Sequence, residues 1–192
     1  MNELKIENII IGKQFENCDN YEKFAKIVSE KNIKVKIVEA GARINIEKDL
    51  YIDVLWPFSK NKILENVLNN NSLVLKLVYL NFSCIFTGDI EEIAEKSILE
   101  KYKNFVQILK ADILKIAHHG SKTSSTEEFL KKVNPKIALI GVGKNNKFGH
   151  PNKNVIERIK NNKIKIFRTD ENGEISISTN GKGKIKIVKT IE

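Results

Sequence analysis

Histidine is scarce in this chain of 192 residues, which contains three of them. None precedes His118; His118 and His119 are adjacent, and His150 follows further along. Imidazole nitrogen is a common metal ligand. Any histidine-based site is therefore expected around the adjacent pair and not in the first half of the chain.

Cysteine is equally scarce, with Cys18 and Cys84 as its two representatives. Their separation does not match the short spacings of cysteine metal sites. Cys84 lies in an apolar strand-like segment, so we expect it to be a small buried hydrophobic residue and not a disulfide partner.

Long apolar runs are absent as well. No segment approaches the roughly 20 apolar residues that cross a bilayer. The run from Leu4 to Ile11 contains Lys5, Glu7 and Asn8, and it lacks the basic start and cleavage site of a signal peptide. Taken alone, the polypeptide has no transmembrane segment and is expected to stay in the cytoplasm.

The composition fits one globular unit, with 41% hydrophobic and 30% charged residues. The 33 basic and 24 acidic residues give a net charge of +9, which attracts polyanions without identifying one. An ordinary solvated basic surface is the plainer interpretation of this charge. No repeat, linker or low-complexity tract divides the chain, so residues 1–192 are expected to form one domain.

Polar residues follow two apolar, strand-like segments. Gly88 and Asp89 close the segment over residues 83–87, and His118 and His119 close the segment over residues 112–117. A carboxylate and an imidazole pair at neighbouring strand ends are typical of a metal site at the edge of a sheet.

Strands and helices alternate along the chain, which predicts an α/β fold. A helix is expected over residues 21–31, with Asp19 or Asn20 as its N-cap, and Asn69-Asn70-Asn71 is expected to break the chain. The remaining expected elements are strands 33–38, 43–46, 51–56, 72–79 and 82–87, helix 90–102, strand 112–117, helix 125–133, strand 136–142, helix 152–161, strand 164–167 and a terminal meander, 174–178 and 184–188, that protects the sheet edge.

Five short motifs occur in order: Thr-Gly-Asp at 87–89, His-His-Gly-Ser-Lys-Thr-Ser-Ser at 118–125, Val-Gly-Lys-Asn-Asn at 142–146, Gly-His-Pro at 149–151 and Arg-Thr-Asp-Glu-Asn-Gly at 168–173. Together they resemble the metallo-β-lactamase-like domain at the C-terminal end of ComEC proteins, the membrane channels for DNA uptake in natural competence. The resemblance runs from about residue 20 to the C-terminus and implies an α/β/β/α sandwich.

One family motif has no counterpart here. A complete family domain carries an H-x-H-x-D-H segment that supplies most ligands of the first metal, and this chain has no histidine before His118. The resemblance therefore implies a partial domain: the C-terminal half plus part of the first half. Its expected partners are DNA and, if the protein is split, a separate N-terminal half or membrane channel; the family domain itself is extracytoplasmic.

The resemblance assigns catalytic and metal-binding roles to Asp89, His118 and His119. Asp89 would bridge two metal ions, although a Gly-Asp pair before a helix is also typical of an N-cap. For the histidines the alternative is a polar pair satisfied at a strand end, and the sequence does not decide which of them is a ligand.

Two loops are candidates for substrate binding. Ser121, Lys122 and Thr123 belong to a hydroxyl-rich segment that could cradle a phosphate or simply cap the next helix. Lys144 and Asn145 could contact a DNA backbone or remain solvated. His150 could contact substrate or make a structural hydrogen bond.

For an intact domain the resemblance implies phosphodiester hydrolysis by a nuclease with divalent metal ions, zinc or manganese, acting in DNA uptake. The alternative is an inactive remnant, or a module that binds DNA or a protein partner. With the first half absent, the metal could be lost, and an exposed apolar face is expected to cause self-association.

Overall fold

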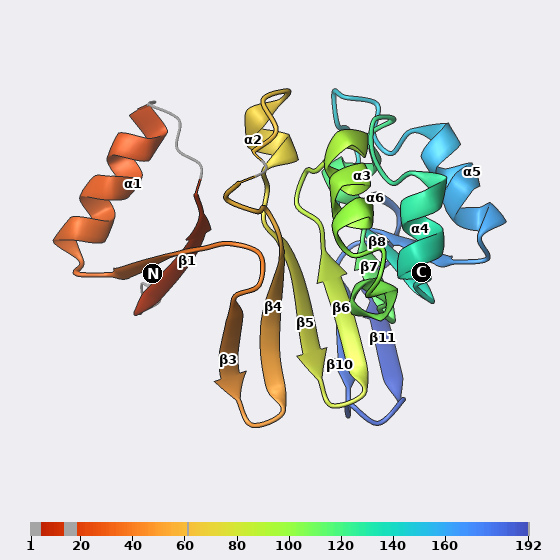
Figure 1. The fold of residues 1–192 in the computed structure, drawn as a ribbon. Coiled ribbons are helices and arrows are strands. Elements are labelled where there is room, and N and C mark those ends of the chain that lie inside the picture. Colours follow the sequence, from red (N-terminus) through yellow and green to blue (C-terminus); the bar gives the residue numbers. More distant parts are fainter. Residues whose placement is uncertain (1–4, 14–18, 61, 192) are drawn as a thin grey trace.

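A seven-stranded mixed sheet forms the centre of the computed structural model, which describes residues 5–13, 19–60 and 62–191 (Figure 1). Its order is β3-β4-β5-β6-β7-β8-β9. The first four strands pair antiparallel: β3 (Arg43–Glu47), β4 (Leu50–Trp56), β5 (Val74–Tyr79) and β6 (Phe82–Phe86). The next three run parallel to β6: β7 (Ile113–Lys115), β8 (Ile137–Ile140) and β9 (Lys165–Arg168).

Three helices cover one face of this sheet: α3 (Glu92–Lys101), α4 (Glu127–Val133) and α5 (Lys153–Asn161) (Figure 1). Their fully buried side chains, including Ile98, Leu130 and Ile159, pack in one cluster with strand residues such as Leu114 and Ile140. The apolar residues whose periodic spacing predicted these helices are thus the residues that the helices bury against the sheet. The predicted α/β alternation is confirmed here.

The terminal hairpin covers part of the opposite face. β10 (Ile175–Thr179) and β11 (Ile185–Lys189) form a separate antiparallel sheet. Alternate isoleucines of the hairpin pack against Phe82, Ile113 and Phe167 of the main sheet. The expectation that this meander protects a sheet edge is therefore wrong, because its apolar stripe is buried by a sheet face.

A smaller unit precedes the main sheet. β1 (Asn8–Gly12) and β2 (Lys34–Val38) pair in parallel, and α1 (Asp19–Glu30) connects them. Figure 1 shows this unit beside the β3 side of the main sheet. The predicted helix and strand are confirmed, but α1 begins at Asp19, so Asp19 and Asn20 lie inside the helix and the predicted N-cap is wrong. α1 contains no buried residue.

One short helix lies in a segment that was expected to be irregular. α2 (Val67–Asn70) overlaps the three asparagines that were expected to break the chain. α6 (Thr169–Asn172) follows β9 directly. Asn71, 2% exposed, donates through Nδ2 to the carbonyls of Ile63 and Val67 at 2.8 and 2.7 Å. Buried amide side chains thus supply the hydrogen bonds that let asparagine end a helix here.

Cys84 is buried and free, as the sequence predicts. Burial raises the pKa of its thiol to about 12, so it behaves as an inert apolar group. The other cysteine, Cys18, lies outside the described residues. None of the helices in the described ranges is long and apolar enough to cross a membrane.

An apolar groove of about 370 Å³ remains between the hairpin and the uncovered part of the sheet. Leu77, Phe86, Leu139 and Ile177 are among its lining residues, and Phe86 is 42% exposed. We expect the groove to bind a hydrophobic dye and to promote self-association that light scattering detects as a mass rising with protein concentration.

A Phe86→Lys variant should lower both dye fluorescence and self-association, because an ammonium group enters the groove. Phe105→Lys is the matched control, since Phe105 is 64% exposed and does not line the groove. A monomer without dye binding would contradict the prediction.

Candidate metal centre

The carboxyl ends of parallel strands meet at one edge of a sheet, and the candidate residues lie there. Asp89 follows β6, His118 and His119 follow β7, and the loop that contains His150 follows β8. The sequence pattern located the first two strand ends, and the parallel pairing of β6 with β7 brings them together.

Asp89 does not cap the following helix. α3 begins at Glu92 with Glu91 at the N-cap position, so the N-cap interpretation of Asp89 is wrong. The Asp89 carboxylate instead lies 3.7 Å from Nε2 of His119 and 4.0 Å from Nζ of Lys115. Lys115 is a neighbour that the sequence analysis missed; burial lowers its pKa while Asp89 opposes that effect.

The histidine pair lies in a left-handed turn and not at the end of an extended strand. His118, His119 and Gly120 have φ values of 48°, 55° and 81°. A Cβ atom on Gly120 would lie 2.6 Å from Cβ of Pro151, so both its conformation and its packing require glycine. Consecutive left-handed residues other than glycine are strained, and such strain clusters at functional sites.

His119 is oriented as a metal ligand would be. Its Nδ1 lies 2.6 Å from the carbonyl oxygen of Gly141, which can only accept, so Nδ1–H donates; in the neutral imidazole the free lone pair is then on Nε2. Nε2 faces Asp89 at 3.7 Å. Ligand atoms lie about 2 Å from a shared ion, so the separation suits one ion held by both.

His118 points to a different neighbourhood. Its Nδ1 is buried without a hydrogen-bond partner and lies 3.6 Å from Oε1 of Glu91. Its ring meets that of His150 edge to face, with centroids 5.7 Å apart. The turn therefore directs His118 and His119 to separate partners.

Glu91 is a second carboxylate of the site that the sequence analysis missed. It accepts hydrogen bonds from Nδ2 of Asn66 at 2.7 Å and Oγ1 of Thr123 at 2.8 Å. Burial raises the pKa of Glu91, but these hydrogen bonds and the neighbouring His118 outweigh burial, so its pKa lies below the ordinary value. Two adjacent acidic residues, Glu91 and Glu92, are common at the start of a helix. The sequence therefore gave no indication that Glu91 belongs to the site.

His150 lies at the rim of the site. Burial and the neighbouring imidazoles of His118 and His119 lower its pKa. Asn146 brackets its backbone: Nδ2 donates to the carbonyl of His150 at 2.6 Å, and Oδ1 accepts from its amide at 2.9 Å. Asn146 thus fixes the backbone of His150, and the His150 ring lies beside that of His118.

Side-chain hydroxyls of the loop over residues 121–126 form hydrogen bonds with other protein atoms. Thr126, and not an earlier hydroxyl, caps α4 by accepting from the amide of Phe129. Oγ of Ser121 lies 3.0 Å from Oγ1 of Thr123, and Oγ of Ser124 donates to backbone carbonyls. These contacts give the hydroxyls structural partners inside the loop.

A buried carboxylate on α3 holds the same loop. Glu95 is fully buried and accepts from the amides of Ser125 at 2.5 Å and Thr126 at 2.8 Å. Arg158 of α5 donates to the carbonyls of Ser124 and Ser125. Burial raises the pKa of Glu95, although the two amides and Arg158 act in the opposite direction.

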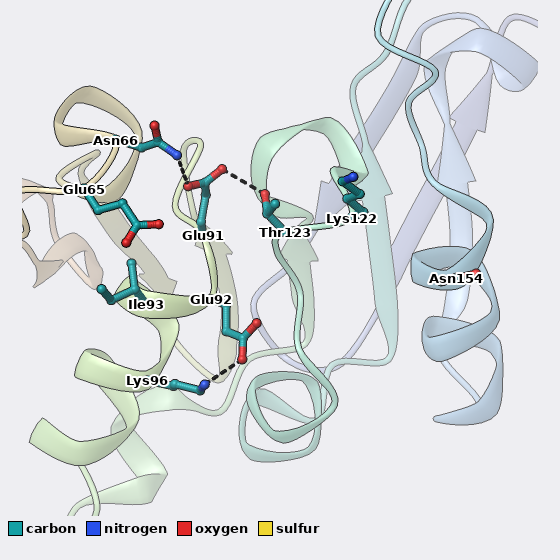
Figure 2. Close-up of a pocket in the computed structure, with 9 residues that line it drawn as sticks. All are labelled: Glu65, Asn66, Glu91, Glu92, Ile93, Lys96, Lys122, Thr123 and Asn154. Carbon is teal, nitrogen blue, oxygen red and sulfur yellow. Dashed lines mark hydrogen bonds and ion pairs between the residues drawn. The ribbon is translucent and has the colours of Figure 1, made fainter.

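A pocket of about 740 Å³ adjoins the site (Figure 2). Glu91 and Thr123 form part of its wall. Figure 2 shows Lys122 next to Thr123, and Asn154 further from Glu91. Of the other candidate substrate residues, Lys144 and Asn145 are exposed in the loop after β8.

Asp89 and His119 can supply part of the ligand set of a metal ion. Asp89 and His119 share a suitable separation, but the part of the chain that the structure describes contains no cluster of three or more His, Cys, Asp or Glu residues able to hold an ion. The proximity of Asp89 to His119 is confirmed; the roles of Asp89, His118 and His119 as ligands stay a prediction.

Two curated relatives carry names from competence. The chain is 36% identical over 171 residues to ComE operon protein 3 of Bacillus subtilis (strain 168), covering 89% of this chain and 21% of that protein. It is 35% identical over 118 residues to Competence protein ComA of Neisseria gonorrhoeae, covering 62% of this chain and 16% of the relative. The chain thus spans about a fifth of the length of the Bacillus protein.

The fold has a counterpart among solved structures. A "Putative metal-dependent hydrolase" from Parabacteroides distasonis superposes with a TM-score of 0.50 at 14% identity, over 86% of this chain and 78% of that one. No model of a known protein family matches. The chain is similar to a segment of ComEC-type competence proteins, and its fold is metallo-β-lactamase-like. This ComEC-like domain has a hydrolase fold and is related to competence proteins.

Replacing Glu95 with alanine should destabilise the ComEC-like domain by about 2 kcal/mol or more, because the buried amide of Ser125 and the partly buried amide of Thr126 would lose their acceptors. Urea unfolding measures the loss. Glu95→Gln should recover part of it, since its amide oxygen can accept one of the two hydrogen bonds.

The matched control is Glu100→Ala on the same helix. Glu100 is exposed, so its loss should change the free energy of unfolding by no more than about 0.5 kcal/mol. Equal unfolding midpoints for Glu95→Ala and Glu100→Ala would refute the role given to Glu95.

Proposed function

We propose that this domain contributes Asp89 and His119 to a divalent-metal site that hydrolyses phosphodiester bonds of DNA, in the DNA uptake of natural competence. The observation that carries the proposal is the orientation of His119: the carbonyl of Gly141 holds Nδ1, and Nε2 faces the Asp89 carboxylate. Relatives named for competence support DNA as the substrate.

Carboxylate oxygen and imidazole nitrogen suit zinc or manganese. A bound divalent ion would supply an activated water and neutralise charge on the phosphate. The protein groups around it have separate tasks. Gly141 fixes the tautomer of His119, and Lys115 places a cation beside Asp89. Glu91 lies 3.6 Å from Nδ1 of His118, on the side of the turn away from Asp89.

The pocket beside the site carries both positive and negative side chains, which attract and repel a polyanion respectively. Lys122 and Lys96 line the adjoining pocket, but so do Glu65 and Glu92. The net charge of +9 acts over the whole surface. DNA binding by this chain is therefore expected to depend strongly on salt.

Manganese should strengthen binding of a single-stranded oligonucleotide to the wild-type chain, because phosphate oxygens can complete the shell of an ion held by Asp89 and His119. Fluorescence anisotropy with and without Mn²⁺ measures the effect. Asp89→Ala and His119→Ala should lose it, whereas Asp53→Asn should keep it, since Asp53 pairs with Arg43 away from the site. A manganese effect unchanged in Asp89→Ala would reject the proposal.

Cleavage of single- or double-stranded DNA by this chain alone should stay near background with added Mn²⁺ or Zn²⁺, because two oriented protein ligands hold an ion weakly. Robust cleavage that Asp89→Ala abolishes would show that further ligands exist in the chain. DNA binding that shows neither cleavage nor a manganese effect would favour the alternative of a DNA-binding module.

A further inference from the structure

Phe148 is an unusually exposed aromatic residue beside the candidate site. Its side chain is 82% exposed, against 64% for Phe105 and 42% for Phe86. Exposure of a whole phenyl ring is unfavourable in water. Next to a candidate site, an exposed ring is accessible to a flat ligand that could cover it.

The loop that carries Phe148 is held in shape. Both polar atoms of the Asn146 side chain bond to the backbone of His150, at 2.6 and 2.9 Å, so this amide closes the loop across Phe148. The amide of Asn146 also donates to the carbonyl of Gly143 at 3.2 Å. A ring presented on a closed loop loses little conformational entropy when it binds.

The ring of Phe148 continues a series of rings that leads to the site. It stacks on His150, with centroids 5.9 Å apart and planes 19° apart, and His150 meets His118 at 5.7 Å. His118 is adjacent in sequence to His119, whose Nε2 faces Asp89. A flat ligand on Phe148 would thus be separated from His118 by the ring of His150, and His118 belongs to the same turn as His119.

The charge of the same loop matches a nucleic acid. Lys144 and Lys147 flank the ring in sequence and are exposed. Cations that follow a phosphate backbone and an aromatic ring that stacks on a base are the combination by which proteins bind single strands.

We propose that Phe148 is a base-stacking residue that binds an unpaired nucleobase of single-stranded DNA next to the candidate metal site. The inference rests on the proposed function for its choice of DNA. It adds a preference for single strands, because bases in a duplex are already stacked and must be flipped out to reach the ring.

The test measures oligonucleotide binding by anisotropy in EDTA, so that no metal contributes. Phe148→Ala should weaken binding of a single-stranded oligonucleotide about tenfold, and Phe148→Tyr should retain it. An abasic oligonucleotide of equal length should bind wild type and Phe148→Ala alike. Phe105→Ala, another exposed phenylalanine, should match wild type.

A second variant reports on the ring itself. The native Trp56 is fully buried, so the emission of an exposed indole in Phe148→Trp can be followed separately. Base-containing single strands should quench it, and abasic strands should not. Quenching with the base-containing strand alone supports stacking.

An equal loss of binding with abasic and base-containing strands would overturn the proposal, and so would unchanged binding by Phe148→Ala. Self-association lost in Phe148→Ala without any effect on DNA would assign the ring to a protein contact and also overturn it. Failure of the metal site appears separately, as a missing manganese effect with base-dependent binding intact.

Discussion

Two glutamates one turn apart at the start of α3 hold the loops of the candidate site together. Glu91 accepts from Asn66 and Thr123, and Glu95 accepts from the amides of Ser125 and Thr126. The helix N-terminus favours negative charge at both positions. Each carboxylate satisfies donors that burial would otherwise leave unpaired. The position of the loop after β7 therefore depends on the start of α3, together with Arg158 of α5, which donates to the carbonyls of Ser124 and Ser125.

The left-handed turn at His118 and His119 exists because its surroundings fix it. The amide of His118 donates to the carbonyl of Gly88, and the amide of Ser121 donates to the carbonyl of His118. These bonds offset a strain on the order of 1–3 kcal/mol for each such residue. The turn separates two adjacent imidazoles: one reaches Asp89, the other Glu91.

The sequence predicts the strand ends well, because apolar runs that stop at Gly88 and at His118 reflect buried strands. It also predicts Asp89 beside the histidines. It misses α2, Glu91 and Lys115, since each depends on contacts between segments far apart in the chain. The terminal hairpin shows the same limit: alternation gives two strands but not the surface that they cover.

Lys115 determines how a metal could be held here. Its ammonium lies 4.0 Å from the Asp89 carboxylate and donates to the carbonyl of Gly88, so Asp89 already has a cationic partner. A divalent ion at Asp89 would be repelled by this ammonium. A phosphate group would be attracted by both cations. The arrangement therefore favours an ion that arrives together with an anionic substrate over an ion bound alone, which agrees with a site of few protein ligands at the edge of the sheet.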